Sequence, residues 1–511
     1  MRSEPIDIGS RLELFVDDEL IESLSGAQRR LHHPVPQDVV LVFDRPWEGN
    51  MCSGISILRD DDGLFRLYYQ AARGGTAEYQ GNPPVLVDAN SSYGCYAESP
   101  DGITWTRPSL GLFEVAGTRA NNVILAPESG ERWASHLGPF EDTRPGVPAA
   151  ERYKGISGIS GRIYAYVSPD GISWRKLTEE PVTEGYDSLH SAFWDAEREE
   201  YRSYCRHRRM AAYQAGMDEL GQAPALATDD QTGLTGDGRD NGRDIITSTS
   251  KDFIHWTEPE FLSYSPGRVN ELYENVVLPY YRAPHLILGF PMRYIDRGWT
   301  AATAALPELE HRRKRAAQFS SREGTALSDA MLMSSRDGTH FSIWPESFIR
   351  PGLRRRDTWT YWDNFVLWGM IETASPIRGA PDEISLFVTE AFLRSGPSHL
   401  RRYTLRVDGF VSACAPLSGG ELLTRPLVFS GSELVVNYAT SAAGSLQVEI
   451  QDAQGVPLPG LALHDSEVMY GDSLEQPMLW RGNPALGALA GTPIRLRFAL
   501  GDADLFSFRF R

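Results

Sequence analysis

A seven-residue motif that returns four times is the strongest constraint on the fold of this chain. Each copy begins with Ser, has Asp at its third position and ends with an aromatic residue. The copies are SPDGITW at 99–105, SPDGISW at 168–174, SKDFIHW at 250–256 and SRDGTHF at 335–341. Asp suits a tight turn because its side chain bonds its own backbone two residues on, and Gly tolerates a positive φ. A turn that repeats every 69 to 85 residues indicates a structural unit that stacks or circles.

The residues around each copy alternate as short strands joined by turns. Around the first copy, residues 54–59 and 64–69 flank the turn DDDG, and residues 92–98 lead into the motif. The third copy has the same order from residue 191 to residue 249. Each unit is therefore predicted to be a meander of three or four antiparallel strands. Helical periodicity is scarce, and the best short helix lies at 307–316, whose basic run we interpret as a solvated face.

Four marked units and one unmarked unit, at 361–406, predict a five-bladed β-propeller. We expect residues 11–18 to supply the closing strand of the last blade. After residue 410 the motif is absent, and alternating strands are joined by Gly/Pro turns, which is typical of a β-sandwich. The prediction is thus an all-β chain with a five-bladed propeller over residues 1–410 and a β-sandwich over residues 411–511.

Composition and charge exclude several classes of protein. Hydrophobic residues make up 41% and charged residues 23%, as in ordinary globular proteins. No run of 18 apolar residues exists, so we expect no membrane partner. The net charge of −18, from 50 Lys and Arg against 68 Asp and Glu, argues against nucleic acid as a partner. The first residues contain no apolar leader, so a cytoplasmic location is expected.

Metals and cofactors are not predicted. The four cysteines are far apart and lack C-x-x-C spacing, so we expect buried free thiols. The chain contains no H-E-x-x-H and no G-x-x-x-x-G-K-[ST]. The Asp-rich, Gly-rich stretch at 228–242 lacks the complete calcium-loop pattern, and we interpret it as a solvated insertion.

Together these features resemble the five-bladed propeller glycoside hydrolases, above all glycoside hydrolase family 32 and its relatives in families 43 and 68. The segment SKDFIHW at 250–256 is similar to the blade-closing S-K-D-x-x-x-W of family 32, and the appended sandwich also resembles that family. The resemblance implies three carboxylates at the starts of successive inner strands, facing a central funnel. One acid protonates the leaving oxygen, a second group acts as nucleophile or base, and a third stabilises the charged sugar.

The resemblance implies a catalytic residue in each of the first three blades. WEGN at 47–50 takes the place of the family's W-M-N-D-P-N-G, so Glu48 is the expected nucleophile or base, although the match is poor. FEDTRP at 140–145 resembles F-R-D-P, so Asp142 is the expected charge stabiliser, oriented by Arg144 and Arg152. Asp187 takes the place of the family's acid. The alternatives are a rim residue for Glu48 and turn residues for both aspartates.

Further residues are expected to bind the sugar. Glu271 and Glu274 precede the fourth inner strand, and either of them suits hydroxyl binding or replacement of Asp187 as the acid. Trp359, Trp362 and Asp363 look like a sugar platform, because apolar ring faces stack on C–H surfaces while a carboxylate takes the hydroxyls. Packing between blades is the alternative for the tryptophans. The predicted substrate-binding set is Asp44, Trp47, Arg144, His190, Glu271, Glu274, Trp362 and Asp363.

The expected function is hydrolysis of a glycosidic bond. By resemblance, the carbohydrate substrate is a furanoside such as a fructoside or an arabinofuranoside. Transfer to another sugar or ring closure uses the same carboxylates and stays open. A carbohydrate-binding propeller without turnover is the alternative from another class. A homo-oligomer is also left open.

Overall fold

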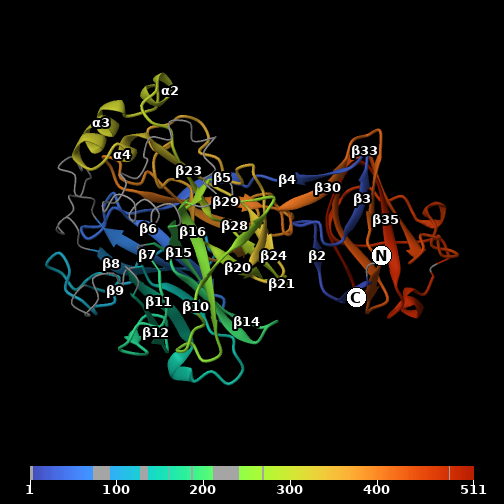
Figure 1. Cartoon of the computed structure of the whole chain (residues 1–511), viewed down its shortest axis with the longest axis horizontal. Helices are drawn as coiled ribbons and strands as arrows, with labels where there is room; N and C mark the ends of the chain where they lie inside the picture. Colours follow the sequence, from blue (N-terminus) through green and yellow to red (C-terminus); the bar gives the residue numbers. More distant parts are fainter. Residues whose placement is uncertain are drawn as a thin grey trace, which may run out of the picture. The chain divides into compact units, whose positions relative to one another are not determined.

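The computed structural model forms two compact units, which are described separately (Figure 1). The larger unit comprises Pro34–Tyr280 and Pro284–Thr404. The smaller unit comprises Met1–His33, Tyr281–Ala283 and Leu405–Arg511. The structure describes residues 4–72, 92–126, 136–159, 162–185, 188–210, 241–267, 270–482 and 484–511.

Five sheets follow one another along the larger unit and form the blades of a β-propeller. Within each blade the strands are mostly antiparallel, and the innermost strand comes first in the chain except that the edge strands β18 (Ser263–Ser265) and β5 (Val35–Val42) precede it in the last two blades. The first blade consists of β6 (Ser53–Arg59), β7 (Phe65–Ala72), β8 (Ser92–Ser99) and β9 (Val123–Leu125). The second consists of β10 (Gly138–Glu141), β11 (Tyr153–Ile159), β12 (Arg162–Ser168) and β13 (Arg175–Lys176). The third consists of β14 (Ser191–Asp195), β15 (Glu200–Met210), β16 (Asn241–Ser250) and β17 (Glu260–Phe261). The fourth blade consists of β20 (Val277–Tyr280), β21 (Ala283–Gly289), β24 (Met333–Ser335), β25 (His340–Ile343) and β18. The fifth consists of β26 (Phe365–Val366), β27 (Ile371–Thr373), β28 (Glu383–Glu390), β29 (His399–Leu405) and β5.

Trp368 closes the ring of blades. Its backbone N–H donates to Ile55 O at 2.9 Å, and its carbonyl accepts from Ile57 N at 2.8 Å, so the last blade is bonded to the first. Its indole Nε1 donates to Val277 O at 2.8 Å, which ties the last blade to the fourth. Between these points, β6 contacts β10, β10 contacts β14, and β14 contacts β20. The predicted five-bladed propeller is confirmed by this arrangement.

The repeated motif forms the same turn in every copy. In the first, Ser99 Oγ accepts from Gly102 N at 2.9 Å, and Asp101 Oδ1 accepts from Thr104 N at 2.7 Å. Asp170, Asp252 and Asp337 accept equivalent bonds in the other copies. Burial opposes ionisation of Asp101, but the hydrogen bonds from Thr104 and Ile103 prevail and lower its pKa. The turn therefore follows from the Ser-x-Asp spacing itself.

The prediction for the N-terminal segment is wrong. The strand that closes the last blade is β5, which pairs with β29. Residues 11–18 contribute instead β2 (Glu13–Leu14), which pairs with β35 (Ile494–Phe510) in the smaller unit. All residues up to His33 belong to the smaller unit. The prediction had assigned them to the propeller, with residues 1–410. A strand pattern states that a segment is extended, but not which sheet edge it joins.

The smaller unit is a sandwich made by one bonded network of ten strands. Phe498 and Phe508 lie on the same strand, β35, with ring centroids 5.7 Å apart. A straight strand would place them about 33 Å apart, so β35 folds back and contributes to both layers. In Figure 1 the blue N-terminal strands lie among the red C-terminal ones. The other members are β1 (Ile6–Gly9), β3 (Ile21–Ser25), β4 (Gln28–Leu31), β30 (Val411–Ala415), β31 (Gly420–Thr424), β32 (Leu427–Phe429), β33 (Leu434–Asp452) and β34 (Asp472–Pro477).

An insertion in the fourth blade holds the α-helices that the structure describes in the propeller unit. It consists of α2 (Ala301–Ala304), α3 (Leu309–Gln318) and α4 (Arg322–Thr325), which lie together in Figure 1. It also holds a small sheet of β19 (Glu271–Leu272), β22 (Met292–Asp296) and β23 (Ala326–Ala330). Short 3-10 turns occur elsewhere, at Ala149–Glu151, Leu463–Asp465 and Leu486–Leu489.

The predicted helix is confirmed as α3, but its basic run is only partly solvated. Arg312 and Arg315 are buried. Arg312 Nε donates to Pro307 O at 2.9 Å and its Nη2 donates to Trp359 O, so this guanidinium fastens the insertion to the segment before the fifth inner strand. No helix among the described residues is long and apolar enough to cross a membrane. The four cysteines are buried free thiols, as predicted.

Candidate active site

The inner strands give the propeller two distinct ends. Apart from the edge strands β18 and β5, each blade starts with its inner strand, and the inner strands β6, β10, β14 and β20 contact one another in chain order. The residues that precede these strands therefore gather at one end of the ring, which we call the entry end. The turns that follow the inner strands gather at the opposite end, which we call the turn end. The predicted site residues are distributed over both.

Glu48 precedes β6 at the entry end, but it is completely buried. Its carboxylate accepts hydrogen bonds from Tyr69 OH at 2.6 Å, from Arg107 Nε at 2.9 Å and Nη2 at 3.0 Å, and from Arg45 N at 2.9 Å. Burial raises the pKa of Glu48, although Arg107 opposes the shift. Both oxygens are engaged by protein groups, so the geometry does not fit the predicted role of nucleophile or base. Glu48 holds Arg107 within the first blade.

Two further predicted residues flank Glu48. The indole of Trp47 is buried in the core of the first blade, and its Nε1 donates to Asn122 Oδ1 at 3.0 Å. Asp44 is half-buried and lies 3.9 Å from Arg107 Nη2. Trp47 therefore packs against protein and offers no ring face to a sugar, whereas Asp44 keeps part of its carboxylate exposed.

Asp142 lies at the turn end, because it follows β10 and does not precede it. It is buried, and its Oδ2 accepts from Tyr201 OH at 2.5 Å and lies 3.2 Å from Lys154 Nζ. Arg144 is next to it, but only its backbone N–H bonds Asp142, at 3.0 Å, while its guanidinium lies over the Tyr201 ring. The structure places Asp142 and Arg144 away from the entry end. The prediction that they act there is not supported.

Asp142 belongs to a repeated structural tie between blades. Asp60 stands after β6 as Asp142 stands after β10, and its Oδ1 accepts from Tyr153 OH at 2.7 Å. In both cases a phenol at the start of the next blade's second strand bonds the turn carboxylate. Arg152, predicted to orient Asp142, bonds Glu141 instead, at 2.9 Å. The alternative interpretation, a turn residue, describes Asp142 correctly.

His190 precedes β14 at the entry end and is a neutral imidazole. Its Nε2 lies 3.1 Å from Gly158 O, and because a carbonyl only accepts, Nε2 carries the hydrogen and Nδ1 is an acceptor. Complete burial lowers the pKa of His190 to about 3, with Arg206 and His136 adding positive charge nearby. Nδ1 has no partner among the described residues. Asp187, three positions earlier, lies outside the described residues.

Hydrogen bonds join the entry ends of the third and fourth blades. Glu274 is buried, and its Oε2 accepts from Leu189 N at 3.1 Å. Ser191 Oγ donates to Asn275 O at 3.1 Å. Glu274 therefore positions the segment that carries His190. The Oδ1 atom of Asn275 finds no partner in the described parts of the chain.

The approach to the fifth inner strand is strained. Trp359, Trp362 and Asn364 have φ values of 62°, 71° and 62°, which non-glycine residues rarely adopt. Asp363 holds this loop from inside, because its carboxyl accepts from Thr360 N at 3.2 Å and, more weakly, from Phe392 N at 3.4 Å. Burial raises the pKa of Asp363 well above its usual range. Strain of this kind is concentrated at functional sites.

An aromatic cluster joins the fourth and fifth blades at the entry end. The rings of Tyr273 and Trp362 are 4.6 Å apart at 66°, and Trp362 stacks on Phe392 at 5.3 Å. Tyr361 lies 5.4 Å from Trp362. Trp362 is partly exposed, while its Nε1 atom is buried with no partner among the described residues. Trp362 therefore takes part in packing between blades and also keeps exposed ring surface.

Glu271 is a partly exposed carboxylate beside this cluster. Its side chain is 32% exposed, and its Oε2 lies 2.7 Å from Arg243 Nη1 and 2.9 Å from Arg243 N. Arg243 and Arg206 both lie over the Tyr273 ring, at 4.6 Å and 4.9 Å. The sequence analysis did not single out either arginine, because the segments that carry them contain no motif. The R-x-R spacing at 206–208, at the end of a strand, was the available signal.

The entry ends of blades three to five thus form one candidate site. Its members share polar or aromatic chemistry and lie on segments that contact one another: His190, Glu271, Tyr273, Glu274, Asn275, Trp362, Arg206 and Arg243. Of the predicted set, Glu48, Trp47 and Asp363 are buried in protein, and Asp142 and Arg144 lie at the other end.

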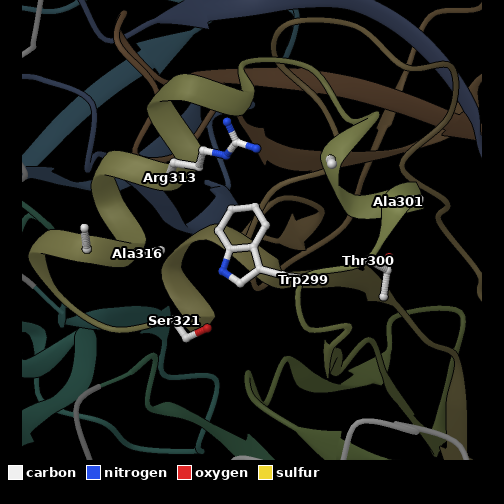
Figure 2. Close-up of a pocket in the computed structure, with 8 residues that line it drawn as sticks. Trp299, Thr300, Ala301, Arg313, Ala316 and Ser321 are labelled. Carbon is white, nitrogen blue, oxygen red and sulfur yellow. The ribbon is translucent and has the colours of Figure 1, made fainter.

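A separate pocket of about 640 Å³ lies in the helical insertion (Figure 2). The Trp299 ring points into it, between the segments that carry Arg313 and Ser321. Its lining includes no carboxylate. Acid–base chemistry on a glycosidic bond needs such a group, so this pocket is not the candidate active site.

In the described part of the chain, one group of side chains has the spacing of metal ligands. Single ligand atoms of Asp357, Glu390 and His399 lie within 4.8 Å of one another. Arg401 Nε donates to Glu390 at 2.8 Å, and Arg355 Nε donates to Asp357 at 3.0 Å. The chain's own guanidinium groups therefore already supply positive charge there, which does not fit a cation site.

No protein-family model and no curated protein matches the chain. Among solved structures, a glycoside hydrolase family 43 arabinoxylan arabinofuranohydrolase from Bacillus subtilis is similar, with a TM-score of 0.41, 11% identity, and coverage of 91% of this chain and 96% of that one. A Bombyx mori GH32 β-fructofuranosidase has a TM-score of 0.36, 10% identity, and 94% coverage of both chains. An N-acetylgalactosamine deacetylase from F. plautii has a TM-score of 0.37, 11% identity, and coverage of 76% and 96%. Similarity at this level defines neither a family nor a site.

Proposed function

We propose that the entry end of the propeller is the active site of a glycoside hydrolase. The observation that carries the proposal is a set of four buried polar atoms without partners among the described residues, on the same entry-end segments as a partly exposed carboxylate and aromatic rings. These atoms are Ser188 Oγ, His190 Nδ1, Asn275 Oδ1 and Trp362 Nε1. Buried polar atoms in folded proteins are normally bonded, so unpaired ones call for a polar ligand or water. A sugar supplies hydroxyls for such atoms and C–H faces for the rings.

The side chains suit distinct roles in this reaction. Glu271, as the carboxylate partner of Arg243, can accept a proton or stabilise a cationic sugar. His190 Nδ1 can accept a hydrogen bond from a hydroxyl, because the imidazole is neutral. Trp362 supplies a partly exposed ring. Asp187 remains the acid predicted from sequence, and a furanoside remains the predicted substrate.

The test is a panel of fructosides, arabinofuranosides and common pyranosides, with products followed by NMR. Glu271→Gln and Asp187→Asn are each expected to lower kcat by about 100- to 10,000-fold, the usual contribution of an acid–base group. Asp142→Asn, at the turn end, is the matched carboxylate control and should retain kcat per folded molecule. Full activity in Glu271→Gln, or loss of activity in Asp142→Asn without loss of stability, would contradict the proposed site.

A carbohydrate-binding propeller without turnover is the second candidate. The observation that favours it is the engagement of Glu48 and Asp142 by protein groups, which removes two of the three carboxylates implied by the family resemblance. The same panel decides between the two, because this candidate predicts sugar binding by calorimetry and no new product.

A further inference from the structure

The loop at 358–364 leads into the fifth inner strand and is strained at three points. Trp359, Trp362 and Asn364 have φ values of 62°, 71° and 62°. Non-glycine residues keep such values only where the surrounding structure determines them. Asn364 N donates to Thr389 O at 3.1 Å, which fixes the end of the loop next to β26. The part of the loop before Trp362 needs further contacts to hold it.

Two buried guanidinium groups bind the carbonyls at the start of this loop. Arg394 Nη2 donates to Thr358 O at 3.0 Å, and Arg312 Nη2 donates to the next carbonyl, that of Trp359. Arg312 is 2% exposed, and burial lowers its pKa to about 10, so it is still a cation at neutral pH. Hydrogen bonds from a cation are roughly twice as strong as neutral ones. The two arginines therefore fix two successive peptide groups.

Arg312 belongs to the helical insertion of the fourth blade, on α3. The preceding residue of that helix, His311, donates from Nε2 to Leu393 O at 2.7 Å, because a carbonyl only accepts. Leu393 follows Phe392, the residue on which the Trp362 ring stacks. Helix α3 thus bonds both the loop that carries Trp362 and the segment that carries its stacking partner.

The insertion also holds another neighbour of the Trp362 ring. Arg322, on α4, donates from Nη1 to Tyr361 OH at 3.1 Å, and the ring centroids of Tyr361 and Trp362 are 5.4 Å apart. The centroids of Tyr273 and Phe392 lie 4.6 Å and 5.3 Å from that of Trp362. Of these neighbours, Tyr361 and Phe392 lie in segments that the insertion bonds. The position of the Trp362 ring therefore depends on the insertion.

We propose that Arg312 is a positioning residue of the entry-end site, which holds the loop at 358–364 in the conformation that presents the Trp362 ring to the sugar. The proposal rests on the proposed function, because it takes Trp362 as a sugar contact. Without the guanidinium, the Trp359 carbonyl loses this donor, and the loop can relax toward ordinary φ values. Trp362 then leaves its place between Tyr273 and Phe392. Arg312 thus contributes to sugar binding through Trp362.

The experiment is a double-mutant cycle on the full chain, with arabinotriose, sucrose and xylotriose as probes. Arg312→Gln and Trp362→Ala should each raise KM, and the dissociation constant by calorimetry, about tenfold. The kcat should stay within about threefold of wild type, because binding shared by ground state and transition state is what is lost. The double variant should bind as weakly as Trp362→Ala alone. Arg312→Lys keeps a cationic donor and should recover part of the affinity.

Hydrogen exchange tests the loop itself, without a sugar. Thr360 N and Asn364 N are hydrogen-bonded in the folded chain. Both amides should exchange at least about tenfold faster in Arg312→Gln, because the loop opens more often. If that variant does not fold, His311→Ala, which removes the bond to Leu393 O, takes its place in the cycle. It should show a smaller rise in KM.

A buried arginine at the turn end supplies the matched control. Arg202 lies near the start of β15, and its Nη1 donates to Gly338 O at 3.3 Å. Arg202→Gln should lower the melting temperature and leave KM and the exchange of residues 358–364 unchanged. A rise in KM as large as that of Arg312→Gln would show that lost stability alone weakens binding, and would overturn the proposal.

A wild-type KM and unchanged exchange in Arg312→Gln also overturn the positioning role. So does a loss of affinity that is equal with and without the Trp362 ring, because Arg312 would then act through another group. Product formation is scored separately in the same samples. Binding of a probe without any product contradicts the proposed hydrolase and leaves the positioning role to the binding cycle. A wild type that binds none of the probes overturns both proposals.

Discussion

Glu48 and His190 are both completely buried, and their hydrogen bonds give them opposite properties. Glu48 has a guanidinium, a phenol and a backbone N–H around its carboxylate. His190 has one carbonyl partner and an imidazole nitrogen with no partner among the described residues. The first group is part of the framework. The second is available to a ligand.

Glu48→Gln should lower stability and spare the chemistry. The substitution leaves Arg107 largely buried without its carboxylate, which costs about 3 kcal/mol of the free energy of unfolding. Denaturant unfolding measures that loss, and kcat measured well below the melting temperature should stay within a few-fold of wild type. Glu114→Gln, at an exposed position, is the control. A variant with normal stability and no turnover would restore Glu48 as a catalytic residue.

His190 should make the protein less stable in mild acid. Its pKa is lowered from 6.5 to about 3 in the folded state, so between these values the unfolded chain binds a proton that the folded chain does not. The free energy of unfolding therefore falls as the pH drops below 6.5, by about 2 kcal/mol between pH 7 and pH 5. His190→Gln should remove that part of the pH dependence in urea titrations. The exposed His464→Gln should leave it in place. An equal slope in all three proteins would show that the pKa of His190 is the same in the folded and the unfolded chain.

At the level of elements, the blade turns could be predicted from sequence and the strand ends could not. The Ser-x-Asp turn is local, since its hydrogen bonds join residues two or three apart, so its sequence pattern suffices. Whether Asp142 precedes or follows the inner strand of its blade depends on where β10 begins. A shift of a few residues moved Asp142 from the expected entry end to the turn end. The functional assignment changed with it.

Substitution by alanine should lower stability more at a turn glycine that contacts a neighbouring blade than at one with no neighbouring atoms. Gly171 has a φ of 72°, and a Cβ there would lie 2.5 Å from the OH of the buried Tyr68. Gly111 has a φ of 70° with nothing within 4 Å. Gly111→Ala should therefore cost about 1 kcal/mol for its backbone conformation, and Gly171→Ala at least about 2 kcal/mol, by thermal or urea unfolding. Equal losses would mean that the contact with Tyr68 is absent.

At the scale of the whole molecule, the chain begins in one unit and then closes the other. Strands β1 to β4 pair within the smaller unit, and β5 completes the fifth blade. Deleting residues 1–33 should therefore abolish the calorimetric transition of the sandwich and preserve that of the propeller. Deleting residues 1–43 should abolish both. A sandwich transition that survives the first deletion would contradict the strand pairing.

The candidate site is also a property of the whole propeller. Blade number and blade order followed from the repeat. The family resemblance added the expectation that functional groups precede the inner strands, and Glu271, His190 and Trp362 do lie at the entry end. The arginines could not be found in this way. Arg208 and Arg243 meet only because β15 and β16 pair in one register, and residues 35 positions apart carry no local sign of that pairing.

The most direct test of the central claim is cleavage of the accepted sugar in ¹⁸O-labelled water, followed by mass spectrometry. If the entry end is a hydrolytic site, the wild type will place one ¹⁸O atom in the product for each bond cleaved. Glu271→Gln will incorporate ¹⁸O at least about 100-fold more slowly, with an unchanged KM. Folded Asp142→Asn will incorporate ¹⁸O at the wild-type rate. Unlabelled product would show transfer or ring closure instead of hydrolysis. Full labelling at the wild-type rate in Glu271→Gln would show that the chemistry lies elsewhere.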